Sequence, residues 1–259
     1  MSLSDDLRLA LDPVAFASQI LDIEPDEWQA QVLRYEGKRI ILNCSRQSGK
    51  SLTSAIKALH LSIYQPGKLI LLVSPSLRQS SELFRVIAGE FAKIKVPMKK
   101  LEDNRLSMTL QNRSRIISLP SKEEKIRGFS SVDLVIFDEA SRIPDDLYYG
   151  VRPMIAVSDG AFIIMSTPAG KRGFFYELFN DDDEAWQRIE LKAVDCPRIP
   201  AEFLEEEKEK MPPWHYEQEY ECVFADSADA VFDTSFIEEA FTNEFEPFPE
   251  AVTEVYPVR

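Results

Sequence analysis

Eight residues decide the fold of this chain: Cys44-Ser45-Arg46-Gln47-Ser48-Gly49-Lys50-Ser51. They follow the apolar run 40–42 and precede a stretch in which apolar residues recur with helical spacing. A strand, a small polar loop and a helix that opens with Gly-Lys-Ser form a phosphate cradle, because loop N–H groups and the helix dipole attract the anion. In such a cradle Lys50 would reach the β- and γ-phosphates, and the Ser51 hydroxyl would ligate Mg²⁺. Cys44 stands where glycine usually begins the loop, so an ordinary strand-to-helix turn is the alternative.

A second apolar run ends in two carboxylates. Residues 134–137 are apolar and are followed by Asp138 and Glu139. Ligands of doubly wound sheets bind at the carboxyl ends of the strands. We therefore expect Asp138 to hold Mg²⁺ through its water shell and Glu139 to orient and polarise an attacking water. The alternative is a strand that simply ends in solvent at two acids. The long separation of Asp138 from Lys50 argues against it, because it leaves room for the intervening strands and helices of a parallel sheet.

Three further polar residues suit the same site. Ser166 and Thr167 end a third apolar run, 161–165, where hydroxyls can sense the γ-phosphate or cap the following helix. Gln29 lies upstream of the loop, and its amide offers one donor and one acceptor to an adenine ring. An ordinary surface glutamine is the alternative for Gln29.

Alternating strand and helix patterns over residues 38–180 predict an α/β fold of the P-loop NTPase type, with a mainly parallel sheet and helices on both faces. The near-continuous apolar run 68–74 is typical of a parallel strand that is covered on both sides. The predicted helices are one or two within 5–21, a run ending at Leu33, then 49–64, 76–93, 200–210 and one from Pro212 onward. The predicted strands are 38–44, 68–74, a hairpin within 105–119, 132–138, 161–166 and the edge strand 186–192.

Charge divides the chain near residue 181. The 259 residues carry a net charge of −14, of which residues 181–259 contribute −17 and residues 1–180 contribute +3. We therefore expect a P-loop core with an N-terminal helical segment over 1–180 and an acidic lid or linker subdomain over 181–259. The most basic stretch, 93–127, holds ten Lys or Arg against four acids and is either a solvated face or a surface for phosphates or for an acidic neighbour.

Composition excludes several classes of protein. No apolar run approaches the length of a membrane span, and the acidic N-terminus lacks the features of a signal peptide. Three cysteines without metal-ligand spacing fit a reducing compartment, and two histidines argue against a histidine-based zinc centre.

Together these motifs resemble the ATPase domain of the large terminase subunit of tailed bacteriophages, the motor that packages double-stranded DNA into procapsids. Loops of this family often lack the leading glycine. The matching residues span about 25–235 and are Trp28-Gln29, Ser45 to Ser51, Ile126-Arg127-Gly128, Leu134 to Ala140, Ser166-Thr167-Pro168 with Gly170, and Glu219-Tyr220-Glu221-Cys222 with Phe224.

The resemblance implies a role for each matching residue. ATP would be held by Gln29 at its adenine, and by Ser45, Gln47, Ser48, Gly49, Lys50 and Ser51. Mg²⁺ would be held by Ser51 and Asp138, with Glu139 as the catalytic carboxylate. Ser166 and Thr167 would couple hydrolysis to motion. Either Arg46, as a sensor of the γ-phosphate, or Arg127, as an arginine finger in a neighbouring subunit, would stabilise the transition state. A surface arginine is the alternative for Arg127.

The resemblance also implies partners and a location. These are double-stranded DNA, the portal protein, the small terminase subunit and further copies of the chain in a ring, in the host cytoplasm and transiently at the portal vertex. We expect no membrane association, and a monomer in isolation. Full large terminases continue into a nuclease domain, whereas this chain shows no strand with such an acid cluster. We expect a truncated protein or a separately encoded motor domain, without nuclease activity.

Two other functions compete with an ATP-hydrolysing motor. A helicase-like DNA translocase would need a second motor lobe with its own arginines, and the acidic C-terminal part shows no second strand–helix series. A non-catalytic ATP-binding assembly switch would not need the water-orienting acid that Glu139 supplies.

Overall fold

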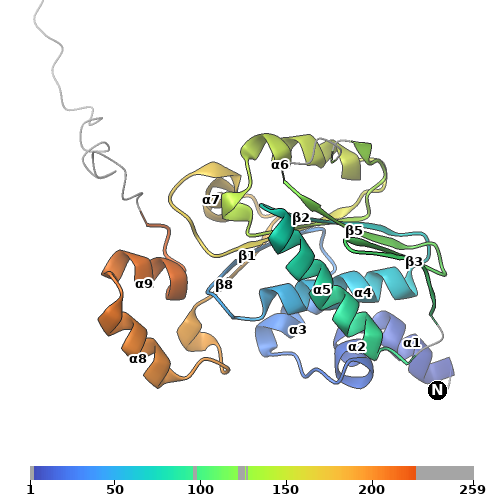
Figure 1. Ribbon diagram of the computed structural model, residues 1–259, viewed down its shortest axis with the longest axis horizontal. Coiled ribbons are helices and arrows are strands. Elements are labelled where there is room, and N and C mark those ends of the chain that lie inside the picture. Colours follow the sequence, from blue (N-terminus) through green and yellow to red (C-terminus); the bar gives the residue numbers. More distant parts are fainter. Residues whose placement is uncertain (1–2, 96–97, 122–125, 127, 226–259) are drawn as a thin grey trace, which may run out of the picture. The chain divides into compact units, whose positions relative to one another are not determined.

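The computed structural model describes residues 3–95, 98–121, 126 and 128–225 (Figure 1). Its centre is an eight-stranded sheet in the order β3-β4-β5-β2-β6-β7-β1-β8. The strands from β5 to β8 in this order run parallel, and β3 and β4 are antiparallel additions at one edge. The strands are β1 Arg39–Cys44, β2 Leu69–Ser74, β3 Lys100–Asn104, β4 Ser107–Leu110, β5 Arg115–Pro120, β6 Leu134–Asp138, β7 Ala161–Ser166 and β8 Gln187–Leu191.

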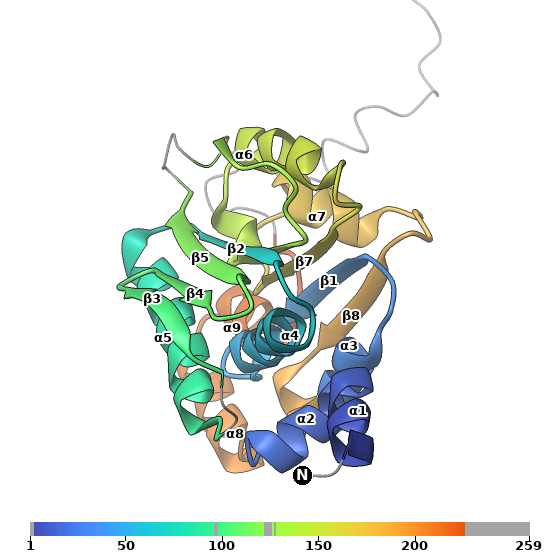
Figure 2. The same ribbon diagram turned by 90° about the vertical axis from the view of Figure 1, so that its right-hand side faces the viewer.

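Helices cover both faces of this sheet (Figures 1 and 2). One face carries α1 Leu3–Leu11, α2 Pro13–Ile20, α3 Glu27–Arg34, α4 Lys50–Tyr64 and α5 Leu77–Lys93. The opposite face carries α6 Asp145–Val151 and α7 Gly173–Asn180, with the short 3₁₀ segments Ala140–Arg142 and Arg152–Ile155. After β8 come a 3₁₀ turn, Ala193–Asp195, and the helices α8 Ala201–Lys210 and α9 Pro213–Tyr220.

Alternate residues of each central strand point into separate cores. Ile40 and Leu42 pack with α2 to α5, whereas Ile41 between them packs with α6 and α7. All six residues of β2 are buried, as expected for a parallel strand that is covered on both faces. Because β6, β7 and β1 are neighbouring parallel strands, their carboxyl ends lie at one common edge of the sheet.

The predicted elements are confirmed, including the break at Asp12 between α1 and α2 and the hairpin of β4 and β5. Strand β3 was not predicted, because its residues are polar and mostly exposed. Strand β8 extends the sheet beside β1, so part of the region beyond residue 180 belongs to the sheet. The subdomain boundary at that residue stays a prediction.

The helices of the described residues are all too short or too polar to cross a membrane. The three cysteines are free and buried.

Candidate nucleotide site

The loop between β1 and α4 has the geometry of a phosphate cradle. Gln47 and Gly49 have φ angles of 57° and 97°, which lie in the left-handed region, and Gly49 caps the N-terminus of α4. The positive φ of Gly49 favours glycine, and a Cβ atom there would lie 2.9 Å from Gln29 Nε2 and 3.1 Å from Arg198 Nη2, the ends of two flexible side chains. The Ser48 hydroxyl closes the loop by donating to Ser45 O at 2.9 Å.

The Ser45 hydroxyl is buried and has no hydrogen-bond partner among the described residues. Buried polar groups nearly always find a partner, and this hydroxyl in a loop of this shape is available to a bound ligand or ion. The cradle therefore fits an anion such as a triphosphate.

Lys50 lies where three strand ends meet. Its side chain is buried, and Nζ donates to Thr167 Oγ1 at 3.3 Å and lies 3.5 Å from Ser45 O. Glu139 Oε1 is 4.0 Å from the same nitrogen. The structure thus brings together residues that follow β1, β6 and β7.

Asp138 is buried at the end of β6. Desolvation, together with the adjacent Glu139 charge, raises the pKa of Asp138 to about 7, and nearby Lys50 offsets part of this effect. A cation beside this carboxylate would favour its ionised form. The Asp138 carboxylate and the Ser51 hydroxyl in the first turn of α4 are hard oxygen donors of the kind that Mg²⁺ takes up together with substrate phosphates.

Glu139 adopts a left-handed backbone with φ of 53°, and its side chain is about one quarter exposed. The turn is tied to the end of β7 through Ser141, whose Oγ lies 2.7 Å from Ser166 Oγ and donates to Thr167 O at 2.9 Å. Non-glycine residues in this conformation cost free energy and are common at functional sites.

Arg46 is paired with Glu219 of α9. Arg46 Nε donates to one carboxylate oxygen and Nη2 lies 3.4 Å from the other, while the Arg46 N–H donates to Glu219 O at 3.2 Å. The pair raises the pKa of Arg46. Because Glu219 is buried, the pair links the phosphate loop to the helices beyond β8.

Gln29 is buried beside the loop, so the surface interpretation of this residue is wrong. Its Oε1 accepts from Asp26 N at 2.9 Å and its Nε2 donates to Thr53 Oγ1 at 3.0 Å. These bonds use one Nε2–H and one Oε1 lone pair, which leaves a second donor and a second acceptor site of the amide for an adenine ring. Arg127 lies outside the described residues.

Arg198, Glu219 and Ser141 were not given roles by the sequence. Arg198 stands in the segment Cys196-Pro197-Arg198-Ile199-Pro200, which carries no motif, and it donates to Ser48 O at 2.6 Å. Glu219 was part of the family resemblance, but only tertiary structure places it against Arg46.

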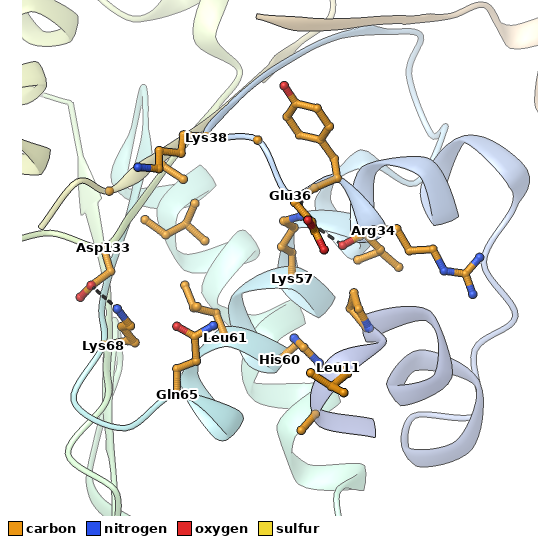
Figure 3. Close-up of a pocket in the computed structure, with 18 of the residues that line it drawn as sticks. Leu11, Arg34, Glu36, Lys38, Lys57, His60, Leu61, Gln65, Lys68 and Asp133 are labelled. Carbon is orange, nitrogen blue, oxygen red and sulfur yellow. Dashed lines mark hydrogen bonds and ion pairs between the residues drawn. The ribbon is translucent and has the colours of Figure 1, made fainter. Parts of the chain in front are cut away.

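A cavity of about 630 Å³ lies at the opposite end of the sheet, away from this loop (Figure 3). Its lining includes Lys38, Lys57, His60, Lys68 and Asp133. Lys68 and Asp133 form an ion pair at 2.8 Å, and Lys57 donates to three carbonyl groups of residues 32–35. Since Lys68 is paired with an acid and backbone carbonyls occupy the Lys57 ammonium, the cavity is a weaker candidate for a phosphate site than the loop.

The family model described as terminase large subunit, T4likevirus-type, N-terminal, matches residues 41–239. The chain belongs to the terminase large subunit family. The large terminase subunits of Thermus phage G20c and Thermus virus P23-45 are each 23% identical over 251 residues, which cover 83% of this chain and 51% of those proteins. The chain thus spans about half the length of these curated relatives.

Solved structures of the family share the fold. The large terminase ATPase domain of Thermus phage P74-26 superimposes with a TM-score of 0.75 at 21% identity, covering 83% of this chain and all of that domain. The HK97 large terminase superimposes with a TM-score of 0.67 at 14% identity, covering 82% of this chain and 54% of that one. The bacteriophage D6E large terminase in complex with ADP superimposes with a TM-score of 0.62 at 12% identity, covering 84% of this chain and 53% of that one. The P-loop NTPase fold is confirmed.

Proposed function

We propose that this chain is an ATP-hydrolysing motor domain of a viral large terminase that powers the translocation of double-stranded DNA into a procapsid. The observation that carries the proposal is the meeting of Lys50, Glu139 and Thr167 at the carboxyl edge of the sheet, beside a loop with an unpaired buried hydroxyl. Family membership supports it, and so do the structures of the D6E large terminase in complex with ADP and with ATP-γ-S.

In this proposal the loop N–H groups and Lys50 bind the β- and γ-phosphates. Bound Mg²⁺ would neutralise phosphate charge and would be held by Ser51 and Asp138. Glu139 orients the attacking water, and its turn is fixed through Ser141 to Ser166 and Thr167. Arg46 reaches the γ-phosphate only after it leaves Glu219, which would pass the state of the nucleotide to α9.

The remaining parts of the proposal extend beyond one subunit. We assign residues 1–180 together with strand β8 to the motor core, and the rest of 181–259 to a lid or linker. Arg127 completes the site of a neighbouring copy in a ring, and the portal protein, the small terminase subunit and DNA are the partners. The working location is the host cytoplasm and the portal vertex.

One experiment separates these ideas: ATP turnover is measured against protein concentration, with and without double-stranded DNA. A site completed by a second copy predicts specific activity that rises with concentration, and a DNA motor predicts stimulation by DNA. Activity that is constant with concentration would favour a site complete within one copy, as in a helicase-like translocase. The absence of any turnover, with ATP bound, would favour the assembly switch.

A further inference from the structure

Arg198 bridges two elements that lie far apart in the sequence. Its Nη2 donates to Ser48 O in the phosphate loop at 2.6 Å, and its Nη1 donates to Asp26 Oδ2 at the N-terminus of α3 at 2.5 Å. The Arg198 side chain is about half exposed, whereas Asp26 is largely covered. A planar guanidinium is suited to this task because its N–H groups point in fixed directions to two acceptors at once.

The bridge closes a circuit of hydrogen bonds around the loop. From Asp26 the circuit runs through its N–H to Gln29 Oε1 at 2.9 Å, and from Gln29 Nε2 to Thr53 Oγ1 at 3.0 Å. Thr53 Oγ1 donates to Gly49 O at 3.1 Å, and Gly49 is joined to Ser48, which accepts from Arg198. The circuit therefore fixes two successive carbonyl groups of the cradle from outside.

The consequence follows from the geometry of the peptide bond. The structure has no cis peptide bond among its described residues, so the Ser48 carbonyl and the Gly49 N–H point in opposite directions. When Arg198 holds the carbonyl, it also sets the direction of the N–H. A cation on the carbonyl side polarises the peptide and makes its N–H a stronger donor.

We propose that Arg198 is a positioning residue for nucleotide binding, which holds the Gly49 N–H toward the phosphates and keeps Gln29 against the loop. The inference rests on the proposed ATPase function and adds a residue to it. Its partners are a loop carbonyl and the cap of α3 rather than Asp138 or Glu139. Arg198 thus governs the affinity for nucleotide and leaves the hydrolysis step nearly unchanged.

The test compares the wild-type chain with the Arg198→Ala and Arg198→Lys variants, by ADP titration calorimetry and steady-state ATP hydrolysis. For Arg198→Ala we expect the Kd for ADP and the KM for ATP to rise about tenfold, the loss typical of one charged hydrogen bond, with kcat within about twofold of wild type. The Kd and KM of Arg198→Lys should lie between those of the wild type and Arg198→Ala, because one ammonium cannot span both acceptors. Asp26→Asn should add little to Arg198→Ala, since both break the same circuit.

Arg85→Ala serves as the matched control, because Arg85 forms a surface ion pair with Glu82 on α5, and its Kd and KM should equal those of wild type. Wild-type Kd and KM in a folded Arg198→Ala protein, or a lower kcat at unchanged Kd, would overturn the inference alone. If Arg198→Ala does not fold, wild-type values in Arg198→Lys would overturn it. A wild-type chain that binds no ADP would overturn the proposed ATPase function together with this inference.

Discussion

Ser141 links the turn after β6, which carries Glu139, to the end of β7, which carries Ser166 and Thr167. It stands two positions after Glu139, and its hydroxyl contacts Ser166 Oγ at 2.7 Å and Thr167 O at 2.9 Å. The left-handed backbone of Glu139 is strained for a residue with a side chain, so it needs support from its surroundings. The Ser141 hydroxyl supplies part of that support.

We expect Ser141→Ala to lower kcat about tenfold while the KM for ATP changes less than twofold, because the carboxylate that orients water loses its fixed direction and the phosphate cradle stays intact. Steady-state ATP hydrolysis measures both constants. Ser158→Ala is the matched control, because its hydroxyl donates to Ile155 O at 3.3 Å in the turn before β7, at the opposite end of the sheet. An unchanged kcat would show that Ser141 does not position Glu139.

The sheet edge formed by β3, β4 and β5, together with its turns, carries the described part of the basic stretch predicted from the sequence. Lys99, Arg105, Arg113 and Arg115 are exposed and form no ion pair with another described residue. By contrast, Lys93 and Lys100 are paired with Glu90 and Asp103. Exposed and unpaired charges are expected both of a solvated face and of a surface that contacts phosphates, so a variant has to separate the two interpretations.

We expect Arg105→Ala with Arg115→Ala to weaken DNA binding and to reduce the slope of log affinity against log salt by about two, one counterion for each lost phosphate contact. Fluorescence anisotropy with a double-stranded DNA at several salt concentrations gives this slope. Lys208→Ala with Lys210→Ala removes the same charge from α8 and should leave the slope unchanged. If both double variants reduced the slope equally, DNA binding would depend on the net charge of the protein rather than on this edge of the sheet.

The order of elements was predictable because the deciding patterns are local. The apolar runs 68–74 and 134–137 predict buried strands by themselves, and the glycine next to Lys50 indicates the start of a helix. Arg198 and Glu219 were not predictable as parts of the site, because their partners lie at least 150 residues away in the chain. For Gln29 the sequence leaves a surface position open as the alternative, because one amide in a short helix gives no sign of the elements that pack over it.

At the scale of the whole molecule, the candidate nucleotide site and the basic segment occupy different parts of the sheet. Strands β3 to β5, with Lys99 and the turns that carry Arg105 and Arg113, form one edge. The candidate nucleotide site lies farther along the sheet, at the carboxyl ends of β1, β6 and β7. A motor of the proposed kind would bind DNA at the β3 edge and would change the position of α9 through the contact of Arg46 with Glu219.

The central claim is that the site hydrolyses ATP, and Glu139→Gln tests it most directly, because the amide keeps the size of the side chain and removes its negative charge. Radiolabelled ATP is mixed with the variant, and bound nucleotide and released phosphate are measured in the same sample. We predict binding within about threefold of wild type and turnover reduced by about 10² to 10⁴. Glu82→Gln, on the surface of α5, should behave as wild type. Turnover by Glu139→Gln at the wild-type rate would contradict the account.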